Sequence, residues 1–239
     1  MEAFRRRNRV ACHLKVIRLD YDRVAMLNRF RQFWTKVITP IANLLLKLGV
    51  SADAVTLVGT IGVVAGALVF FPQGDLLIGV LVITAFVFSD LVDGAMARRL
   101  GSTSKFGAFF DSTLDRIGDG AIFGGLVLYF AGPGDNYLYL CLSLYCLLMG
   151  AVTSYARARA ESLGLDAKGG LAERADRLVA ILVATGLSGL FDLPVLLYVT
   201  LWVLALANTQ TVLLRVLMVR RQALAEAAGK SPEEQIPGA

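Results

Sequence analysis

Residues 89–116 read SDLVDGAMARRLGSTSKFGAFFDSTLDR and follow an apolar run, LLIGVLVITAFVF, at residues 76–88. This stretch places four aspartates at the end of a segment that is long enough to enter a membrane; they are Asp90, Asp93, Asp111 and Asp115. A carboxylate at membrane depth is costly, so residues of this kind usually mark a functional site. What these four do depends on the class of protein that carries them.

Composition and charge spacing predict an all-α polytopic membrane protein. Of the 239 residues, 56% are hydrophobic and 18% are charged, which is little charge for a soluble domain. Lys and Arg are absent from three intervals, residues 48–97, 117–156 and 178–214. Each interval can hold two membrane helices at about 1.5 Å per residue, with a turn sequence near its middle. The turns are FPQGD (71–75), AGPGDN (131–136) and GLFDLP (189–194). We therefore expect six transmembrane helices in three hairpins.

The basic segments between these intervals predict the orientation. The positive-inside rule places both termini and two interior loops in the cytoplasm of a multi-pass cell-membrane protein. Before the first span, residues 23–50 mix basic residues with aromatic and aliphatic ones, which predicts an N-terminal amphipathic juxtamembrane helix on the anionic membrane face.

Three regions follow from this organisation. Residues 26–221 are the expected membrane domain, and residues 222–239 are a polar C-terminal tail. Residues 1–25 form a basic segment that we leave out of the functional argument, because Met26 is a plausible native start. A solvated basic tail is the alternative for residues 1–24.

The aspartates fall on two helix faces. Asp90 and Asp93 are three apart on a helix expected over residues 76–99, so they share a face. Asp111 and Asp115 are four apart on a helix that is expected to begin near Lys105 or Phe106. The two helices are antiparallel across a short loop, so their acidic faces can meet at the cytoplasmic end. Asp119 continues the second face, and we expect a structural role for it.

Four carboxylates that converge at low dielectric repel one another unless they are protonated, paired or bound to cations. An all-oxygen cluster suits Mg²⁺, Mn²⁺ or Ca²⁺, and no set of His and Cys supports zinc here. Two divalent ions about 3.5–4 Å apart would suit phosphoryl transfer. The alternative is a set of solvated helix-end charges paired with nearby arginines. Small residues at Gly94 and Ala97 would let a diphosphate approach the backbone.

These residues resemble a known signature. Asp90-x-x-Asp93-Gly94-x-x-Ala97-Arg98, then Gly107-x-x-x-Asp111-x-x-x-Asp115, is similar to the signature of the CDP-alcohol phosphotransferases. The resemblance implies transfer of a phosphatidyl-type group from a CDP-linked donor to an alcohol, with release of CMP. It also implies Mg²⁺ or Mn²⁺ as cofactor, two ions per site, and a homodimer.

The same resemblance implies roles for individual residues. Asp90, Asp93 and Asp111 would bind metal, and Asp115 would complete the metal site or act as general base; we expect it to be the base. Gly94, Ala97, Arg98 and Gly107 would lie against the CDP group. Asp53 and Thr56 begin the first membrane helix at the place where relatives carry Pro-Asn-x-x-Thr. Thr56 matches that pattern, whereas Ala52 and Asp53 replace Pro and Asn, and helix capping by Ser51 or Asp53 is the alternative.

Arginines on the cytoplasmic side indicate an anionic, phosphorylated acceptor. The arginines near the site are Arg157, Arg159, Arg174 and Arg215, and we expect such a cluster to face that acceptor. Anchoring of the inner face is the alternative role for each.

The pattern TSYARARAESLGL (153–165) with GGLAERADRL (169–178) resembles the phosphatidylinositol-phosphate synthases of actinobacteria. That resemblance implies CDP-diacylglycerol and inositol phosphate as substrates and phosphatidylinositol phosphate as product. It also implies an acceptor-phosphate site formed by Arg157, Arg159 and Arg215, to which we add Arg174. The alternative is a phosphatidylglycerophosphate synthase that uses glycerol 3-phosphate. A cation transporter with an acidic intramembrane site is an alternative of another class, although acids at only one end of the helices disfavour it. We expect membrane lipids, and no nucleic acid, as further partners.

Overall fold

The structure, a computed structural model, describes residues 39–40, 43–87, 96, 104–170 and 173–227, and the statements below refer to these residues. They form helices joined by turns and loops, and no strand occurs among them. The helices are α2 (Ala52–Ala65), α3 (Leu76–Val87), α5 (Lys105–Ala131), α6 (Tyr137–Ser162), α7 (Arg174–Phe191) and α8 (Pro194–Ala227). A π-helical turn, η1 (Gly66–Phe70), and a 3-10 turn, η2 (Phe71–Gln73), continue α2.

The turns between these helices lie at the three predicted sequences. Gly74 adopts φ +88° between η2 and α3, residues 132–136 join α5 to α6, and Asp192 adopts φ +53° between α7 and α8. Three segments are long and apolar enough to cross a membrane, namely Ala52–Gln73, Tyr137–Ser162 and Pro194–Ala227. The all-helical membrane class predicted from the charge intervals is therefore confirmed.

Side-chain caps explain where several helices begin. Ser51 Oγ accepts a hydrogen bond from the Ala54 N–H at 3.2 Å, and Ser104 Oγ accepts one from the Gly107 N–H at 2.8 Å. A cap of this kind satisfies one of the N–H groups that have no partner within the helix. The α5 cap fixes the helix start at Lys105, one of the two expected positions.

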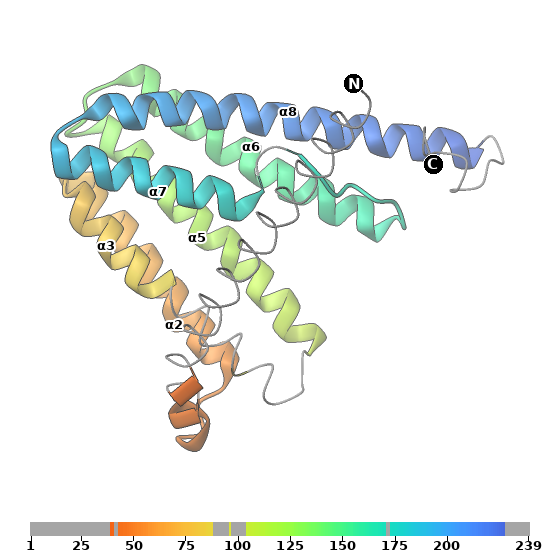
Figure 1. The fold of residues 1–239 in the computed structure, drawn as a ribbon, viewed down its shortest axis with the longest axis horizontal. Coiled ribbons are helices and arrows are strands. Elements are labelled where there is room, and N and C mark those ends of the chain that lie inside the picture. Colours follow the sequence, from red (N-terminus) through yellow and green to blue (C-terminus); the bar gives the residue numbers. More distant parts are fainter. Residues whose placement is uncertain (1–38, 41–42, 88–95, 97–103, 171–172, 228–239) are drawn as a thin grey trace, which may run out of the picture.

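The helices pack in a ring in the order α2, α5, α6, α8, α7 and α3, and α3 contacts α2 again. α5 lies between α2 and α6, α8 packs against α6 and α7, and α7 also contacts α3 (Figure 1). A Cβ atom at Gly125 would lie 2.7 Å from the Ala67 carbonyl oxygen, so the close approach of α5 to η1 requires glycine. The largest fully buried side chains include Phe71, Ile83, Met96, Ile122, Leu126, Phe130, Ile181, Leu197 and Leu201.

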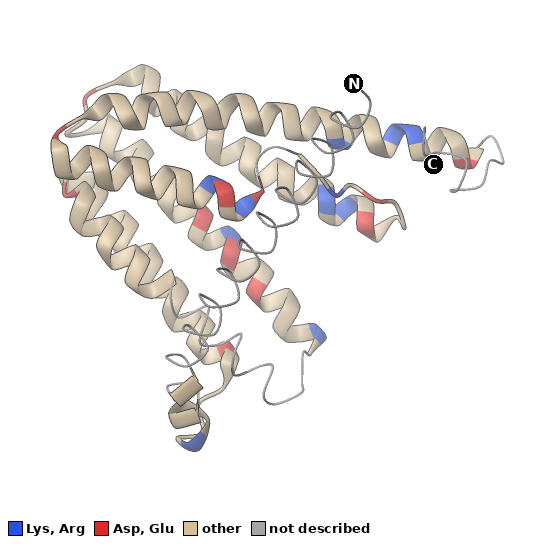
Figure 2. Ribbon diagram, in the orientation of Figure 1, with Lys and Arg blue, Asp and Glu red and all other residues tan. Residues whose placement is uncertain are grey.

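The surface is that of a protein surrounded by lipid. On α8, Trp202 is 46% exposed and Leu206 is 68% exposed, and a soluble protein rarely shows an apolar surface of this extent. Long stretches of α3, α7 and α8 carry no charge, and the basic residues gather at one end of the bundle (Figure 2). Acidic residues occupy the turns at the opposite end, at Asp75, Asp135 and Asp192.

Two predicted regions lie only partly within the described residues. The juxtamembrane helix lies mostly outside them, and its last part, residues 43–47, is helical and ends at Gly49 with φ +77°. At the other end, α8 continues through Ala227, so the first residues of the expected polar tail belong to the last helix.

Candidate active site

The acidic face of α5 forms one wall of the site. Asp111, Asp115 and Asp119 follow one another at intervals of four residues, so they share a face. The Asp115 side chain is 23% exposed, and Asp111 is exposed. A Cβ atom at Gly107 would lie 3.5 Å from Asp53 Oδ1, which places Asp53 of α2 beside the start of this face. Asp53 and Gly107, both expected to contact the CDP group, therefore lie next to each other.

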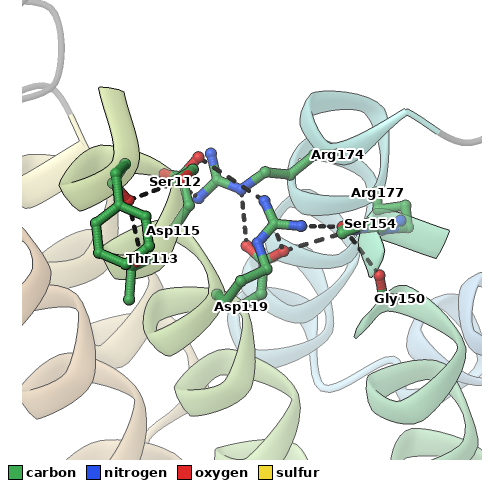
Figure 3. Close-up of polar contacts among 10 residues, drawn as sticks. Ser112, Thr113, Asp115, Asp119, Gly150, Ser154, Arg174 and Arg177 are labelled. Carbon is green, nitrogen blue, oxygen red and sulfur yellow. Dashed lines mark hydrogen bonds and ion pairs between the residues drawn. The ribbon is translucent and has the colours of Figure 1, made fainter. Parts of the chain in front are cut away.

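Arg174 joins the acidic face to α7. Its Nη2 atom lies 2.9 Å from Asp115 Oδ1, and its Nε donates to Asp119 Oδ1 at 3.0 Å. One guanidinium thus bridges two carboxylates that lie one helical turn apart (Figure 3). Charge-assisted hydrogen bonds of this kind fix the orientation of both partners. Arg174 therefore holds Asp115 in place as well as adding positive charge.

Arg116 supplies a second link, toward α6. Its Nη2 atom lies 3.8 Å from Asp115 Oδ2 and 3.9 Å from Asp119 Oδ2. Its Nη1 donates to the hydroxyl of Ser154 on α6. Arg116 therefore connects the acidic face to the helix that carries Arg157.

Arg177 lies in the interior, with 2% of its side chain exposed. Its Nη2 atom is 3.6 Å from Asp119 Oδ2, and a Cβ atom at Gly150 would lie 3.6 Å from its Cζ. A buried guanidinium needs a counter-ion, because the loss of solvation otherwise destabilises the fold. Asp119 serves Arg174, Arg177 and Arg116 together, which agrees with the structural role expected for it.

Removing the Asp119 carboxylate tests this role. We expect Asp119→Ala to lower the free energy of unfolding by about 3 kcal/mol, because the buried Arg177 charge loses its counter-ion. Thermal unfolding of the detergent-solubilised protein, followed by the reactivity of the buried Cys146 thiol, measures the change. Glu226→Ala, at the exposed end of α8, is the control. Equal melting temperatures for the two variants would contradict the role.

A second wall of the site is basic. Arg215 on α8 is 4% exposed; its Nε donates to the Gly169 carbonyl at 3.3 Å, and its Nη1 donates to the Thr153 carbonyl. Arg157 on α6 is partly buried and pairs with Glu161 at 3.0 Å. Arg215 is thus fixed by backbone carbonyls, whereas Arg157 is held by a side chain on its own helix.

These arginines line one cavity of about 460 Å³. The arginines in its wall are Arg116, Arg157, Arg174, Arg177 and Arg215, and the other polar residues include Ser112, Ser154, Glu161 and Glu173. We call it the basic cavity. Of the four arginines predicted for the acceptor phosphate, Arg157, Arg174 and Arg215 lie in its wall. Arg159 is absent from the lining and donates instead to Ser162 Oγ at 3.3 Å.

The predicted metal and donor residues are only partly described. Asp90, Asp93, Gly94, Ala97 and Arg98 lie outside the described residues. Thr56 is buried near the start of α2, and its hydroxyl donates to the Ala52 carbonyl at 3.1 Å. Within the described ranges, no group of three or more His, Cys, Asp or Glu side chains is arranged to hold a metal ion. Asp111 and Asp115 offer carboxylate oxygens only, and that donor chemistry fits Mg²⁺ or Mn²⁺.

Among the residues that line the basic cavity without a predicted acceptor role are Arg116, Arg177 and Ser154. Arg116 had been considered only as a partner for the aspartates, and Arg177 and Ser154 had no assigned role. A signal existed for Arg177, because it follows Arg174 by three residues and therefore lies on the same helix face. Ser154 precedes Arg157 by three residues on α6 and shares its face for the same reason.

Comparison with known proteins identifies the family. Residues 50–170 match the family model of the CDP-alcohol phosphatidyltransferases. A phosphatidylinositol phosphate synthase of Streptomyces avermitilis is 53% identical over 221 residues, which cover 90% of this chain and 91% of the relative. The chain belongs to the CDP-alcohol phosphatidyltransferase family. Both resemblances predicted from the sequence are therefore confirmed, and this phosphatidyltransferase is an enzyme rather than a cation transporter.

Solved structures resemble this phosphatidyltransferase over most of its length. The phosphatidylinositol phosphate synthase of Mycobacterium tuberculosis, solved with CDP-DAG bound, is 42% identical with a TM-score of 0.73. The match covers 77% of this chain and 94% of that structure. The same synthase in complex with manganese and citrate gives a TM-score of 0.71 at 42% identity and covers 76% and 88% of the two chains.

Proposed function

We propose that this phosphatidyltransferase is a phosphatidylinositol phosphate synthase. It transfers the phosphatidyl group of CDP-diacylglycerol to a hydroxyl of inositol phosphate, releases CMP and forms phosphatidylinositol phosphate. The observation that carries this proposal is the basic cavity, in which five arginines meet and one of them, Arg174, also contacts Asp115 at 2.9 Å. The relatives described above carry the same activity in their names.

The lining of the basic cavity favours inositol phosphate over glycerol 3-phosphate. Guanidinium groups suit the acceptor phosphate, because their planar N–H groups match phosphate oxygens. Ser112, Ser154, Glu161 and Glu173 add hydroxyl and carboxylate groups to the same wall. Such groups can bond to several ring hydroxyls, and glycerol 3-phosphate has only two free hydroxyls to offer them. The proposed phosphate ligands are Arg157, Arg174 and Arg215. Arg159, which does not line the cavity, is proposed to anchor the protein at the membrane surface.

The acidic side of the site is proposed to hold the donor. Asp90, Asp93, Asp111 and Asp115 would bind two divalent cations, Mg²⁺ or Mn²⁺, and a relative has been solved with manganese. When bound, these ions supply positive charge against the diphosphate of the donor. The proposed contacts of the CDP group are Asp53, Thr56, Gly94, Ala97, Arg98 and Gly107.

The transfer needs one proton acceptor, which we assign to Asp115. The acceptor hydroxyl oxygen forms a bond to the phosphorus of the phosphatidyl group, and the bond from that phosphorus to the bridging oxygen of CMP breaks. The hydroxyl proton passes to the Asp115 carboxylate. Arg174 restricts the rotation of that carboxylate, because its Nη2 atom lies 2.9 Å from Asp115 Oδ1. The reacting groups therefore meet with little reorganisation.

The membrane arrangement completes the proposal. The basic residues gather at one end of the bundle, which supports a cytoplasmic location for that end. We therefore propose six spans, a juxtamembrane helix on the inner face and both termini in the cytoplasm. The protein then works as a multi-pass enzyme of the cell membrane, where the lipid donor is dissolved, and as a homodimer. Cross-linking in native membranes, followed by gel electrophoresis, checks the dimer.

An acceptor panel tests the function. We expect CMP release from CDP-diacylglycerol with Mg²⁺ to be about 100-fold faster with inositol phosphate than with inositol, glycerol or serine, because an uncharged acceptor leaves the arginines unpaired. Chelation of divalent cations with EDTA should stop the reaction. Preference for glycerol 3-phosphate would make the protein a phosphatidylglycerophosphate synthase. No CMP release with any of these acceptors would contradict both activities.

A further inference from the structure

The loop that joins α6 to α7 is attached along one face of α8. Three residues of α8 contact it, and their spacing of four and seven positions places Thr211, Arg215 and Gln222 on that face. Gln222 contacts Asp166, and Arg215 contacts Gly169. A Cβ atom at Gly170 would lie 2.8 Å from Thr211 Oγ1. The loop therefore runs antiparallel to α8 and passes directly over Arg215, one of the arginines of the basic cavity.

Gln222 makes the attachment at the far end of this face. Its Oε1 accepts a hydrogen bond from the Asp166 N–H at 2.9 Å, and its Nε2 donates to the Asp166 carbonyl at 2.6 Å. Nε2 also lies 3.4 Å from the carbonyl of Met218 in its own helix. The carboxamide thus pairs with both polar groups of one peptide residue, much as a neighbouring strand would. Two bonds to a single residue fix its position and its orientation.

A short series of contacts connects Asp166 to Gly169, the residue that binds Arg215. The Lys168 N–H donates to Asp166 Oδ1 at 2.9 Å, and Ala167 between them is fully buried. The next residue, Gly169, presents the carbonyl that accepts from Arg215 Nε at 3.3 Å. Gly170 has φ +126° and packs against Thr211, so a residue with a side chain would not fit there. The segment from Asp166 to Gly170 is held at both ends.

The orientation of Arg215 depends on two backbone carbonyls. One belongs to Thr153 of α6, and the other is the Gly169 carbonyl of this loop. Together they fix the plane of the guanidinium. Within the described residues Nη2 makes no hydrogen bond or ion pair, and it can therefore serve an anion in the basic cavity. If the loop shifts, one of the two carbonyls is lost and the guanidinium can rotate.

We propose that Gln222 is a positioning residue for the acceptor phosphate. It holds the α6–α7 loop at Asp166 and so keeps the Gly169 carbonyl where it orients Arg215. This inference rests on the proposed function, because it takes Arg215 as a ligand of the acceptor phosphate. Gln222 itself does not line the basic cavity, so its effect reaches the acceptor only through the loop.

A double-mutant cycle tests the proposal with CDP-diacylglycerol, Mg²⁺ and inositol phosphate as the assay. We expect Gln222→Leu, which keeps the side-chain size, to raise the KM for inositol phosphate about fivefold, as expected for the loss of two solvent-accessible hydrogen bonds. The KM for CDP-diacylglycerol and kcat stay unchanged. In an Arg215→Lys background, Gln222→Leu adds nothing further, because lysine has no Nε–H for the Gly169 carbonyl. Additive effects would overturn the proposal, since interacting residues are non-additive.

A control and a second measurement separate this proposal from the proposed function. Gln73→Leu removes a comparable hydrogen bond, 2.8 Å to the Val69 carbonyl at the other end of the bundle, and should leave every constant unchanged. Lys168 is the only Lys or Arg in residues 160–173, so trypsin cleavage after it reports on the loop. Faster cleavage in Gln222→Leu is expected, and unchanged cleavage with an unchanged KM would overturn the attachment. Faster cleavage together with an unaltered KM in Arg215→Lys would instead overturn the acceptor site.

Discussion

Asp115→Asn is expected to lower kcat about 1000-fold or more while the protein stays folded. Asparagine keeps the size of the side chain, but it can neither take a proton nor offer an anionic oxygen to a divalent cation. Loss of a general base alone lowers rates by about 100- to 10,000-fold, and loss of a metal ligand adds to this. Asp119 still pairs with Arg174 at 3.0 Å in the variant, so the link between α5 and α7 survives. CMP release in a single-turnover experiment measures the effect.

The control for this variant is Asp192→Asn. Asp192 lies in the turn between α7 and α8 with φ +53°, a conformation that asparagine adopts readily, and it is remote from the acidic face of α5. We expect its activity and melting temperature to match the unsubstituted protein. If Asp115→Asn kept its kcat within tenfold at an unchanged melting temperature, Asp115 would be neither the base nor a necessary metal ligand.

Arg215→Ala is expected to have the next largest effect, and on a different constant. Removing a charge-assisted hydrogen bond costs about 2 kcal/mol, which corresponds to a rise of roughly 30-fold in the KM for inositol phosphate. The KM for CDP-diacylglycerol should not change, because Arg215 lies in the basic cavity and not beside the acidic face. Initial rates at saturating concentrations of one substrate and varied concentrations of the other separate the two constants.

Arg221→Ala provides the matched control, because Arg221 is an exposed arginine on the same helix and does not line the basic cavity. Its constants should stay within about twofold of those of the unsubstituted protein, as expected for a surface charge. If Arg215→Ala raised the KM of both substrates equally, Arg215 would serve the packing of α6 against α8 rather than the acceptor.

The features that the sequence could predict are those with local causes. The intervals without Lys and Arg place the hairpins, and the turn residues at their centres mark where each hairpin bends, because both reflect the solvent around each segment. The four-residue spacing from Gly107 to Asp115 places these residues on one face, because the period of a helix is fixed. Ser104 caps α5, so the helix begins at Lys105.

The remaining features depend on contacts between distant segments. Arg174 reaches Asp115 and Asp119 across the α5–α7 interface, and no spacing rule relates residues so far apart. Arg157 and Arg159 are two residues apart and do not share a helix face, and spacing alone could not tell which of them faces the acceptor; only Arg157 lines the basic cavity. Gln222 was expected to lie in a polar tail, and no local pattern could reveal its partner Asp166, which is 56 positions away in the chain. Tertiary structure was needed to reveal these pairs.

α8 is long enough that one continuous helix lies partly in lipid and partly in water. Its 34 residues extend about 51 Å at 1.5 Å per residue, whereas the hydrocarbon layer is about 30 Å thick. Roughly two fifths of the helix therefore extends beyond the hydrocarbon layer, at the end that carries the basic residues. There its backbone is open to urea and to hydrogen exchange, although the lipid-embedded part is shielded from both. Mild denaturant should thus unfold the basic end of the helix first, and enzyme activity should be lost before the helix bundle unfolds.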